Sequence, residues 1–126
     1  MLHSYEVAID CDGSGDAIDY AGGTITGKVV GIKYTYGTLA AGTDLVITGE
    51  TSTAPIFTIA DAGAANNFWW PRLLPNKHTD GAAFTDATGG APYVFAERIK
   101  IVTDEGGNLG AGTITFYVKS DEFISE

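Results

Sequence analysis

Apolar side chains recur at every second position in several short runs of this chain, and that period restricts its fold more than any other feature. The clearest run is 112–119, where Ile114, Phe116 and Val118 face one way and polar residues, with Tyr117, face the other. No stretch repeats apolar residues at helical spacing over three turns. Successive side chains of a β-strand point to opposite faces, so the pattern predicts half-buried strands rather than helices.

Further strands are expected wherever this alternation returns between glycine-rich connections. They are Leu2–Asp10 with Tyr5, Val7 and Ile9 inward, Thr24–Tyr36, a strand around Leu45 and Ile47, one from Pro55 through Phe57 and Ile59, Phe68–Arg72, and Tyr93–Thr103. Threonine suits strands and glycine suits turns, and the chain has 17 glycines. Pro71 places the Phe68–Arg72 strand at an edge or an end.

Two of the expected strands raise the question of which face is buried. In Thr24–Tyr36 one face holds Val30, Ile32, Tyr34 and Tyr36. Ile25 and Val29 fall on the opposite face, so a bulge or burial on both faces is expected near Val29 and Val30. In Tyr93–Thr103 the residues in phase are Tyr93, Phe95, Ile99 and Ile101.

About seven strands at short intervals predict an all-β fold, a single-domain antiparallel β-sandwich or barrel that is jelly-roll-like. The length of 126 residues fits one domain over 1–126. Residues 73–91 are expected to form one long loop, and loops of that length are usually functional or disordered. Residues 120–126 are expected to form a C-terminal tail.

The charge of the chain excludes some partners. Sixteen acidic against seven basic residues give a net charge of −9. Nonspecific nucleic-acid binding depends on Lys and Arg neutralising phosphates, so nucleic acid is not expected as a partner. No apolar run approaches the roughly 18 residues of a membrane span, so no membrane is expected either. The N-terminus lacks the features of a secretory signal, which predicts synthesis and retention in the cytoplasm.

The sequence contains no recognisable catalytic motif. There is no glycine-rich phosphate loop followed by Lys, no nucleophile elbow and no paired-histidine zinc motif. Cys11 is the only cysteine, so it cannot form an internal disulfide and is expected to be a reduced side chain near a strand end. We therefore predict no catalytic residues and no cofactor. An enzyme acting through two carboxylates that face each other across a cleft is the alternative.

The segment 10–16 is the one motif with metal-binding character. Asp10, Asp12, Ser14 and Asp16 supply oxygens at positions 1, 3, 5 and 7 of a calcium loop. Position 12 of that loop is Ala21 instead of a bidentate Glu, and no flanking helices are expected. An Asx/Gly turn joining two strands is the favoured interpretation, with a cation site as the alternative.

Large aromatic and cationic residues are the candidates for subunit contact, because Trp and Arg are enriched at interface hot spots. Alternation places Phe68 and Trp70 on one face and Trp69 on the other, so one tryptophan is expected in the core and the other under the long loop or a partner. The candidate interface residues are Trp69, Trp70, Arg72, His78, Tyr5 and Phe123. Stacking of a carbohydrate on Trp69 or Trp70 is an alternative.

The C-terminal tail Ser120–Glu126 is a further candidate for contact. It carries Phe123 and Ile124 in an acidic context. It is expected either to fray, as chain ends commonly do, or to become ordered on a neighbouring subunit.

Several segments together resemble a known class of protein. They are Gly23–Tyr34, Gly42–Glu50, Pro55–Thr58, Pro71-Arg72, Glu97–Val102, Gly106–Asn108 and Gly112–Val118. Over roughly residues 20–119 the chain resembles small structural proteins of tailed-bacteriophage virions that are encoded among head-assembly genes. Each segment alone is common β-turn and strand chemistry, so the likeness depends on their order.

The resemblance implies a capsid decoration, or cement, protein. Such proteins typically form trimers on the outer shell and clamp neighbouring capsid subunits, and they have no catalytic residues to carry over. The implied partners are the major capsid protein and the chain itself as a homotrimer. The implied location is the outer capsid surface of a virion assembled in the host cytoplasm. A neck or tail position in the same virion is the alternative, followed by a carbohydrate- or Ca²⁺-binding β module.

Overall fold

The computed structural model of the chain describes residues 2–72 and 91–120. These residues form seven strands, and no helix among them is long and apolar enough to cross a membrane. The strands are β1 (Leu2–Asp10), β2 (Ala17–Thr35), β3 (Asp44–Gly49), β4 (Pro55–Ile59), β5 (Asn67–Trp69), β6 (Tyr93–Asp104) and β7 (Ala111–Lys119). The predicted all-β fold is confirmed.

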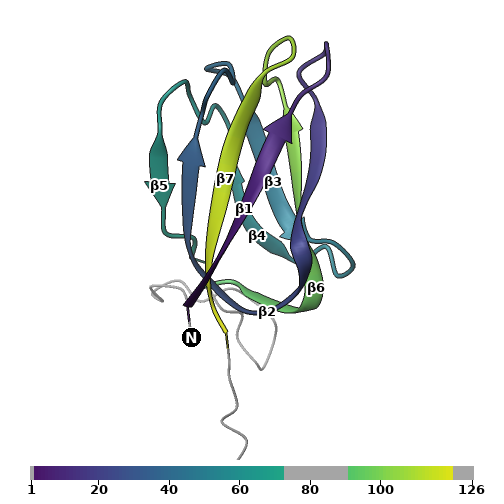
Figure 1. Cartoon of the computed structure of the whole chain (residues 1–126), viewed down its shortest axis with the longest axis vertical. Coiled ribbons are helices and arrows are strands. Elements are labelled where there is room, and N and C mark those ends of the chain that lie inside the picture. Colours follow the sequence, from purple (N-terminus) through teal and green to yellow (C-terminus); the bar gives the residue numbers. More distant parts are fainter. Residues whose placement is uncertain (1, 73–90, 121–126) are drawn as a thin grey trace, which may run out of the picture.

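The long strand β2 belongs to both layers of the molecule. Its first half, 17–28, pairs with β6, and its second half, 28–35, pairs with β7. The end of the second half also pairs with β5. The hydrogen-bonded path β1-β7-β2-β6-β3-β4 therefore folds over on itself at β2 (Figure 1).

Counting the halves of β2 separately gives two antiparallel layers. One has the order β1, β7, second half of β2, β5, and the other has the order first half of β2, β6, β3, β4. This connectivity, with the first and last strands adjacent in one layer, is that of a jelly roll. Figure 1 shows the first of these layers, with β1 beside β7, and with β7 and β5 on either side of the second half of β2. The expected jelly-roll-like sandwich is confirmed from strand order.

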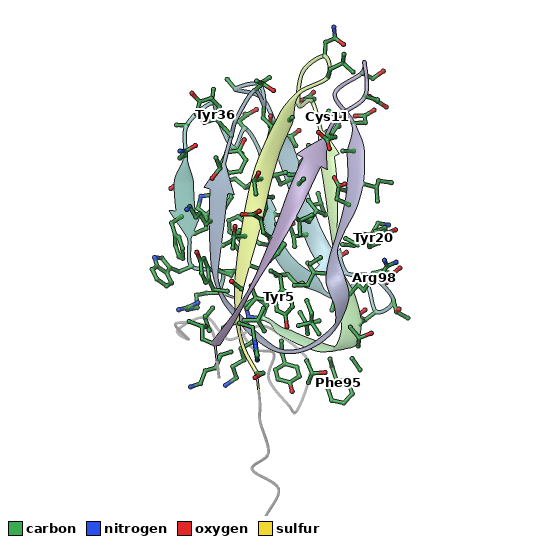
Figure 2. The ribbon with its side chains drawn as sticks, in the orientation of Figure 1. Tyr5, Cys11, Tyr20, Tyr36, Phe95 and Arg98 are labelled. Atoms are coloured by element: carbon green, nitrogen blue, oxygen red, sulfur yellow. The ribbon has the colours of Figure 1, made fainter. Side chains whose placement is uncertain are left out.

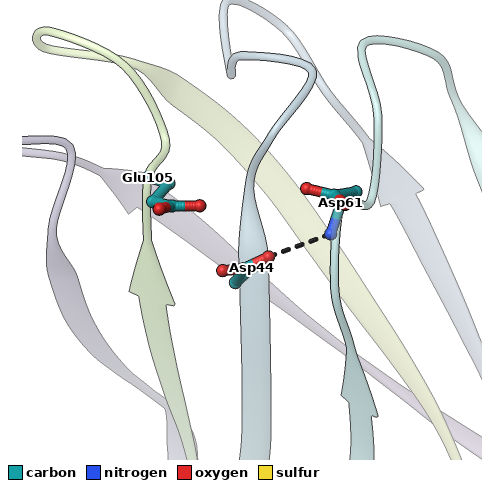
Figure 3. Close-up of side chains that lie close together, drawn as sticks. All are labelled: Asp44, Asp61 and Glu105. Atoms are coloured by element: carbon teal, nitrogen blue, oxygen red, sulfur yellow. Dashed lines mark hydrogen bonds between the residues drawn. The ribbon is translucent and has the colours of Figure 1, made fainter.

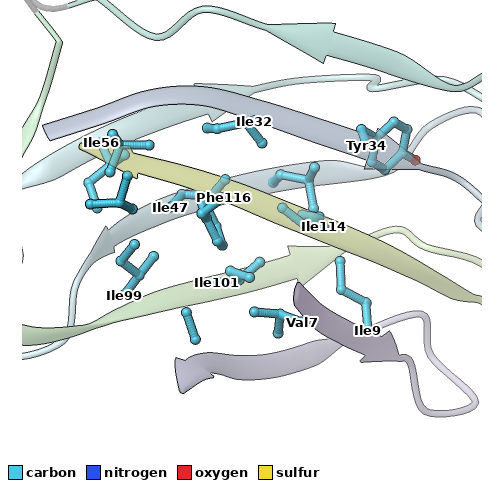
Figure 4. Close-up of a cluster of buried hydrophobic side chains, with 14 of the residues drawn as sticks. Val7, Ile9, Ile32, Tyr34, Ile47, Ile56, Ile99, Ile101, Ile114 and Phe116 are labelled. Atoms are coloured by element: carbon cyan, nitrogen blue, oxygen red, sulfur yellow. The ribbon is translucent and has the colours of Figure 1, made fainter. Parts of the chain in front are cut away.

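The core lies between the two layers, where their apolar side chains meet (Figure 4). Val7 and Ile9 of β1 and Ile114, Phe116 and Val118 of β7 are buried, as their alternation predicts. The remaining large core residues are Ile25, Val29, Ile32, Tyr34, Leu39, Leu45, Ile47, Ile56, Val94, Ile99 and Ile101. Their burial fixes which face of each layer is left for other contacts.

The bulge in β2 is confirmed, but its effect on Val30 differs from the prediction. The register with β7 shifts between Val29 and Gly31. Val29 and Ile32 are fully buried, whereas Val30 is half-buried and lines a groove on the outer surface. A bulge adds one residue to a strand and so changes the phase of its side chains. The prediction that Val30 shares a face with Ile32 is therefore wrong.

The first residues of β6 were also assigned to the wrong face. Phe95 is 70% exposed and Tyr93 is exposed, while Val94 is buried. The register with β2 shifts at this point, and Ala96 has a left-handed φ of 54°. The extra residue reverses the alternation before Ile99 and Ile101, which are buried as expected.

The limits of two strands differ from those predicted. β2 begins at Ala17 and not at the predicted Thr24. The sequence pattern does not reveal these first residues, because Ile18 and Tyr20 face solvent while small alanines face inward, the reverse of the usual arrangement. β5 ends at Trp69 instead of Arg72. The predicted long loop 73–91 lies outside the described residues except for its last position, as does the tail after Ser120.

Candidate protein-docking face

The two tryptophans have separate environments, as alternation predicts. Trp69 is half-buried and packs against the core, with its ring centroid 5.2 Å from that of Tyr34 and 5.1 Å from that of Phe57. Trp70 is 65% exposed, and its ring lies 4.6 Å from that of Phe68 on the outer side of the layer. Trp69 therefore serves the fold, and Trp70 is available for contact.

A row of aromatic rings crosses the outer face of the layer formed by β1, β7, the second half of β2 and β5. The Phe68 ring lies 4.6 Å from Trp70 and 5.7 Å from Tyr117 of β7. The rings border a shallow groove of about 210 Å³, here called the aromatic groove, lined by Leu2, Val30, Gly31, Phe68, Trp70 and Tyr117. Every one of these side chains is apolar or aromatic.

The aromatic groove depends on a glycine in the β2 bulge. The Phe68 ring lies directly over Gly31, where a Cβ atom would come within 2.6 Å of Phe68 Cζ and 2.8 Å of Cε1. Only glycine leaves this space free for the ring. The bulge therefore has two effects: it turns Val30 outward, and it places a glycine beneath Phe68. The groove is thus specified by local sequence at residues 29–31.

Three lysines frame the aromatic groove, and we call them the lysine frame. Lys119 lies opposite Leu2 on β1 and opposite Lys28 on β2. Lys33 lies opposite Phe68 on β5. Directly opposed residues on antiparallel strands share a face, so all three lysines lie on the face that carries the groove. This face is here called the candidate docking face, or docking face. All three are exposed, and none forms a salt bridge within the described part of the chain.

Carboxylates gather at the opposite end of the sandwich, here called the acidic end. They are Asp10, Asp12, Asp16, Asp44, Asp61, Asp104 and Glu105, all at or just beyond strand ends on the side where Cys11 lies (Figure 2). No lysine or arginine of the described ranges occurs there. The molecule is therefore electrostatically polar, with the lysine frame towards one end and this cluster at the other.

Three members of the acidic end lie together in Figure 3. Carboxylate oxygens of Asp44, Asp61 and Glu105 lie within 4.8 Å of one another. Asp44 Oδ1 also accepts a hydrogen bond of 2.9 Å from the Asp61 amide. The charges of Asp44 and then Asp104 raise the pKa of Glu105. The arrangement is consistent with repulsion between exposed carboxylates as well as with cation binding.

The segment 10–16 forms the Asx turn that was favoured. Asp12 Oδ1 accepts hydrogen bonds from the Ser14 amide at 2.8 Å and the Asp16 amide at 3.1 Å. These backbone hydrogen bonds lower the pKa of Asp12. A hydrogen bond shared with Asp104 raises the pKa of Asp16. The Asp12 carboxylate therefore has a structural role in joining β1 to β2.

Cys11 is buried next to this turn. Burial first, and then the charge of Asp12, raise the pKa of its thiol. Its Sγ packs so closely on Gly106 that a Cβ there would come within 2.6 Å. Both features are typical of a protonated, structural cysteine and not of a nucleophile.

Of the other predicted interface residues, Tyr5 and Arg72 do not line the aromatic groove. Tyr5 is half-buried against the core, with its ring 6.3 Å from that of His3. Arg72 is exposed, and its Nη1 donates a hydrogen bond to the Pro71 carbonyl at 2.6 Å. His78 and Phe123 lie outside the described residues.

Sequence reasoning missed most of the aromatic groove. Leu2, Val30, Phe68 and Tyr117 were not proposed as contact residues, although Tyr117 and Phe68 have the outward phase that could have indicated them. The pairing of β2 with β5 and β7 brings these residues together, and no local pattern reports it.

Comparisons with known proteins identify no related protein. A scan against protein-family models, a search of curated proteins and a search of solved structures each found no match.

Proposed function

We propose that this chain is a non-enzymatic structural subunit of a tailed-bacteriophage virion, a decoration protein that binds the major capsid shell as a homo-oligomer. The observation that carries the proposal is the aromatic groove inside its lysine frame. A contiguous exposed apolar patch on a soluble domain generally marks an interaction surface. Trp70, which is largely exposed, has the residue type most enriched among interface hot spots.

The shape of the groove favours a protein partner over a small molecule. Small-molecule sites are typically concave cavities of about 300–1,000 Å³. The aromatic groove is shallower and smaller, about 210 Å³, and it lies on the flat outer face of a sheet. Its walls are rings and strand backbone held by the core beneath, so little order has to be gained on docking.

Charge supports an acidic partner surface at this face. The net charge of −9 favours solubility at high concentration, as a protein present in many copies requires. The lysine frame gives the docking face a local positive charge, which would select and orient a partner that carries carboxylates. The placement on the head follows from the sequence resemblance, and a neck or tail position is the alternative.

Asp16, Glu105 and Cys11 fit a structural role. Asp16 and Glu105 are exposed, and their raised pKa values come from neighbouring carboxylates rather than from an apolar cleft. The Cys11 thiol is held protonated. None of these groups has the environment that activates an acid, base or nucleophile.

A second candidate function is carbohydrate binding. The row of Trp70, Phe68 and Tyr117 offers ring faces along one surface, the arrangement on which sugar rings can stack. Titration calorimetry with a glycan panel tests it: heat that disappears in a Trp70→Ala variant would support it, and no heat from any glycan would remove it.

Cosedimentation with purified heads that lack this protein tests the proposed function. The wild-type chain should bind saturably, and Trp70→Ala should weaken binding about tenfold or more, the effect of losing one hot-spot side chain. Phe95→Ala is the matched control, because Phe95 is equally exposed but lies on β6 (Figure 2). Failure of the wild-type protein to bind heads, necks or tails would refute a virion role.

A further inference from the structure

The aromatic groove lies beside the point where the chain leaves the sheet. β7 passes the groove at Tyr117 and reaches Lys119, which lies opposite Leu2 of the groove. The backbone of Ser120 then crosses β2 at Gly27, where a Cβ would come within 3.0 Å of Ser120 Cα. The six residues that follow are Asp121-Glu122-Phe123-Ile124-Ser125-Glu126.

We propose that the aromatic groove binds residues 121–126 of a second copy of this chain. This occupant rests on the proposed function, because it names the partner at the same docking face. In the assembled protein each copy offers its tail to one neighbour and receives the tail of another. The groove thereby supports capsid binding through assembly: it holds the copies together, and the assembled copies bind the shell multivalently.

The composition of the tail is complementary to that of the groove. The tail carries three carboxylates, from Asp121, Glu122 and Glu126, around two apolar residues. The groove carries three lysines around an apolar floor. An aromatic side chain such as Phe123 packs well against existing rings, and such pairs contribute beyond the area they bury. Both the charge and the shape of the occupant are thus present in the chain itself.

The lysine frame has an unfavourable feature that such a tail would relieve. Lys28 and Lys119 lie directly opposite each other on adjacent strands. Like charges in this position repel. Within residues 2–72 and 91–120, no carboxylate forms a salt bridge with either lysine. A carboxylate placed between the two ammonium groups would replace repulsion with two attractions.

A second copy suits the groove better than the tail of the same chain. β7 runs past the groove, so a tail returning to its own groove would have to reverse direction within Asp121 and Glu122. Such a reversal would have to be made without Gly or Pro, since only Asp121 and Ser125 of the tail are of turn-forming types. Extended, six residues span at most about 20 Å, which is enough to cross onto an adjacent subunit.

A tail-to-groove contact is heterologous, because the two partners use different surfaces. Contacts of this kind close into a ring when the rotation between copies permits. A closed ring would use every groove and every tail, which is consistent with the expected homotrimer. It would also join several shell-binding surfaces in one particle and so strengthen binding to the capsid by multivalency.

Light scattering after size-exclusion chromatography, on the full chain without heads, tests the occupant. The wild-type protein should elute as an oligomer. The double variant Phe123→Ser and Ile124→Ser should elute as the 13.2 kDa monomer. Leu109→Ser is the matched control, because Leu109 is an exposed apolar residue on the turn before β7, and it should leave the oligomer intact.

A mixing experiment separates exchange between copies from occupancy within one chain. A Trp70→Ala chain with an intact tail, mixed with the tail double variant, has one usable groove and one usable tail. The mixture should form dimers, although each variant alone is monomeric. If the wild-type protein is monomeric, or if the tail variant remains oligomeric, the proposed occupant is wrong. Monomers whose tryptophan emission shifts on tail substitution, but not when Trp70 is already replaced by Ala, would show same-chain occupancy, which also overturns it.

Cosedimentation with heads distinguishes a wrong occupant of the groove from a wrong proposed function. If Trp70→Ala loses head binding while the tail variant stays oligomeric and binds heads, the groove contacts the shell and the tail does not occupy it. If oligomers depend on the tail but ignore every virion part, the occupant is correct and the virion role is not.

Discussion

A glycine at position 31 sets the geometry of the docking face. Gly31 lies within the β2 bulge, and the Phe68 ring occupies the space that any side chain there would need. The same bulge turns Val30 out of the core and into the groove. One residue thus couples a backbone irregularity to the surface on which the proposed function depends.

Replacing Gly31 with alanine should disrupt the aromatic groove without destabilising the fold. Its Cβ would come within 2.6 Å of Phe68 Cζ, so the exposed ring must move. Gly31 is buried beneath the Phe68 ring, but that ring is itself exposed and the core neighbours Val29 and Ile32 are untouched. We expect near-native thermal unfolding but loss of oligomer and of head binding. A fully assembled Gly31→Ala protein would contradict this role of the ring.

Among the elements, the turn between β3 and β4 shows how a distant strand can stabilise a loop. Glu97 of β6 accepts hydrogen bonds at Oε1 from the amides of Thr51 at 2.7 Å and Ser52 at 2.8 Å. Its Oε2 accepts one from the Ser52 hydroxyl at 2.6 Å. The carboxylate fits because Gly49 beneath it has no side chain. The Ser52 hydroxyl and amide bonds lower the pKa of Glu97.

Glu97→Gln should lower the melting temperature, because the amide group cannot replace all of the carboxylate's acceptor positions. A lowered pKa in the folded state means that the ionised form stabilises the fold above the ordinary carboxyl pKa. That contribution is lost as pH falls through the folded-state pKa, so the difference from wild type should shrink in acid. Glu6→Gln is the control for the loss of one charge. Equal melting temperatures for both variants at pH 7 would show that the Glu97 hydrogen bonds to Thr51 and Ser52 do not stabilise the fold.

At the scale of the whole molecule, charge is separated between two ends. At the acidic end, neighbouring carboxylates raise the pKa of Asp16, which lies beside Asp104, and the pKa of Glu105, which lies beside Asp44. The docking face at the other end carries the lysine frame. A polar charge distribution of this kind orients a particle relative to a charged surface before contact.

The acidic end predicts greater stability in mild acid than at neutral pH. For Asp16 and Glu105 the folded-state pKa is raised, so the folded state binds protons more tightly than the unfolded state does. Stability should rise as pH falls from neutral towards the ordinary carboxyl range of about 4. Below it, Asp12 and Glu97, whose pKa values are lowered, should reverse the trend. Thermal unfolding between pH 7.5 and pH 3 measures this.

Added salt and one substitution test whether repulsion at the acidic end causes this pH dependence. Added salt should raise the melting temperature at pH 7.5 more than in mild acid, because it screens exposed carboxylates. Glu105→Gln should raise it at pH 7.5, whereas Glu6→Gln, away from the acidic end, should not. A melting temperature that falls steadily from neutral pH downward would show that repulsion at the acidic end is unimportant.

The sequence alone determined the class of fold and much of the core. Alternation in β1, β3 and β7 was sufficient because each has one buried face, so local pattern and tertiary position agree. The separate roles of Trp69 and Trp70 followed from the same rule. It failed where one extra residue changed the phase, at Val30 and at Phe95, and where alanines faced inward at the start of β2.

Only the tertiary structure decided the docking face. The aromatic groove combines residues from β1, β2 and β7 with Phe68 and Trp70, positions far apart in the chain that pairing brings together. The lysine frame is likewise set by register, which hydrogen bonding between distant strands fixes. A period of two residues specifies which side chains of each strand face the core. The neighbours of an outward side chain depend instead on strand order, and packing of the whole core decides that order.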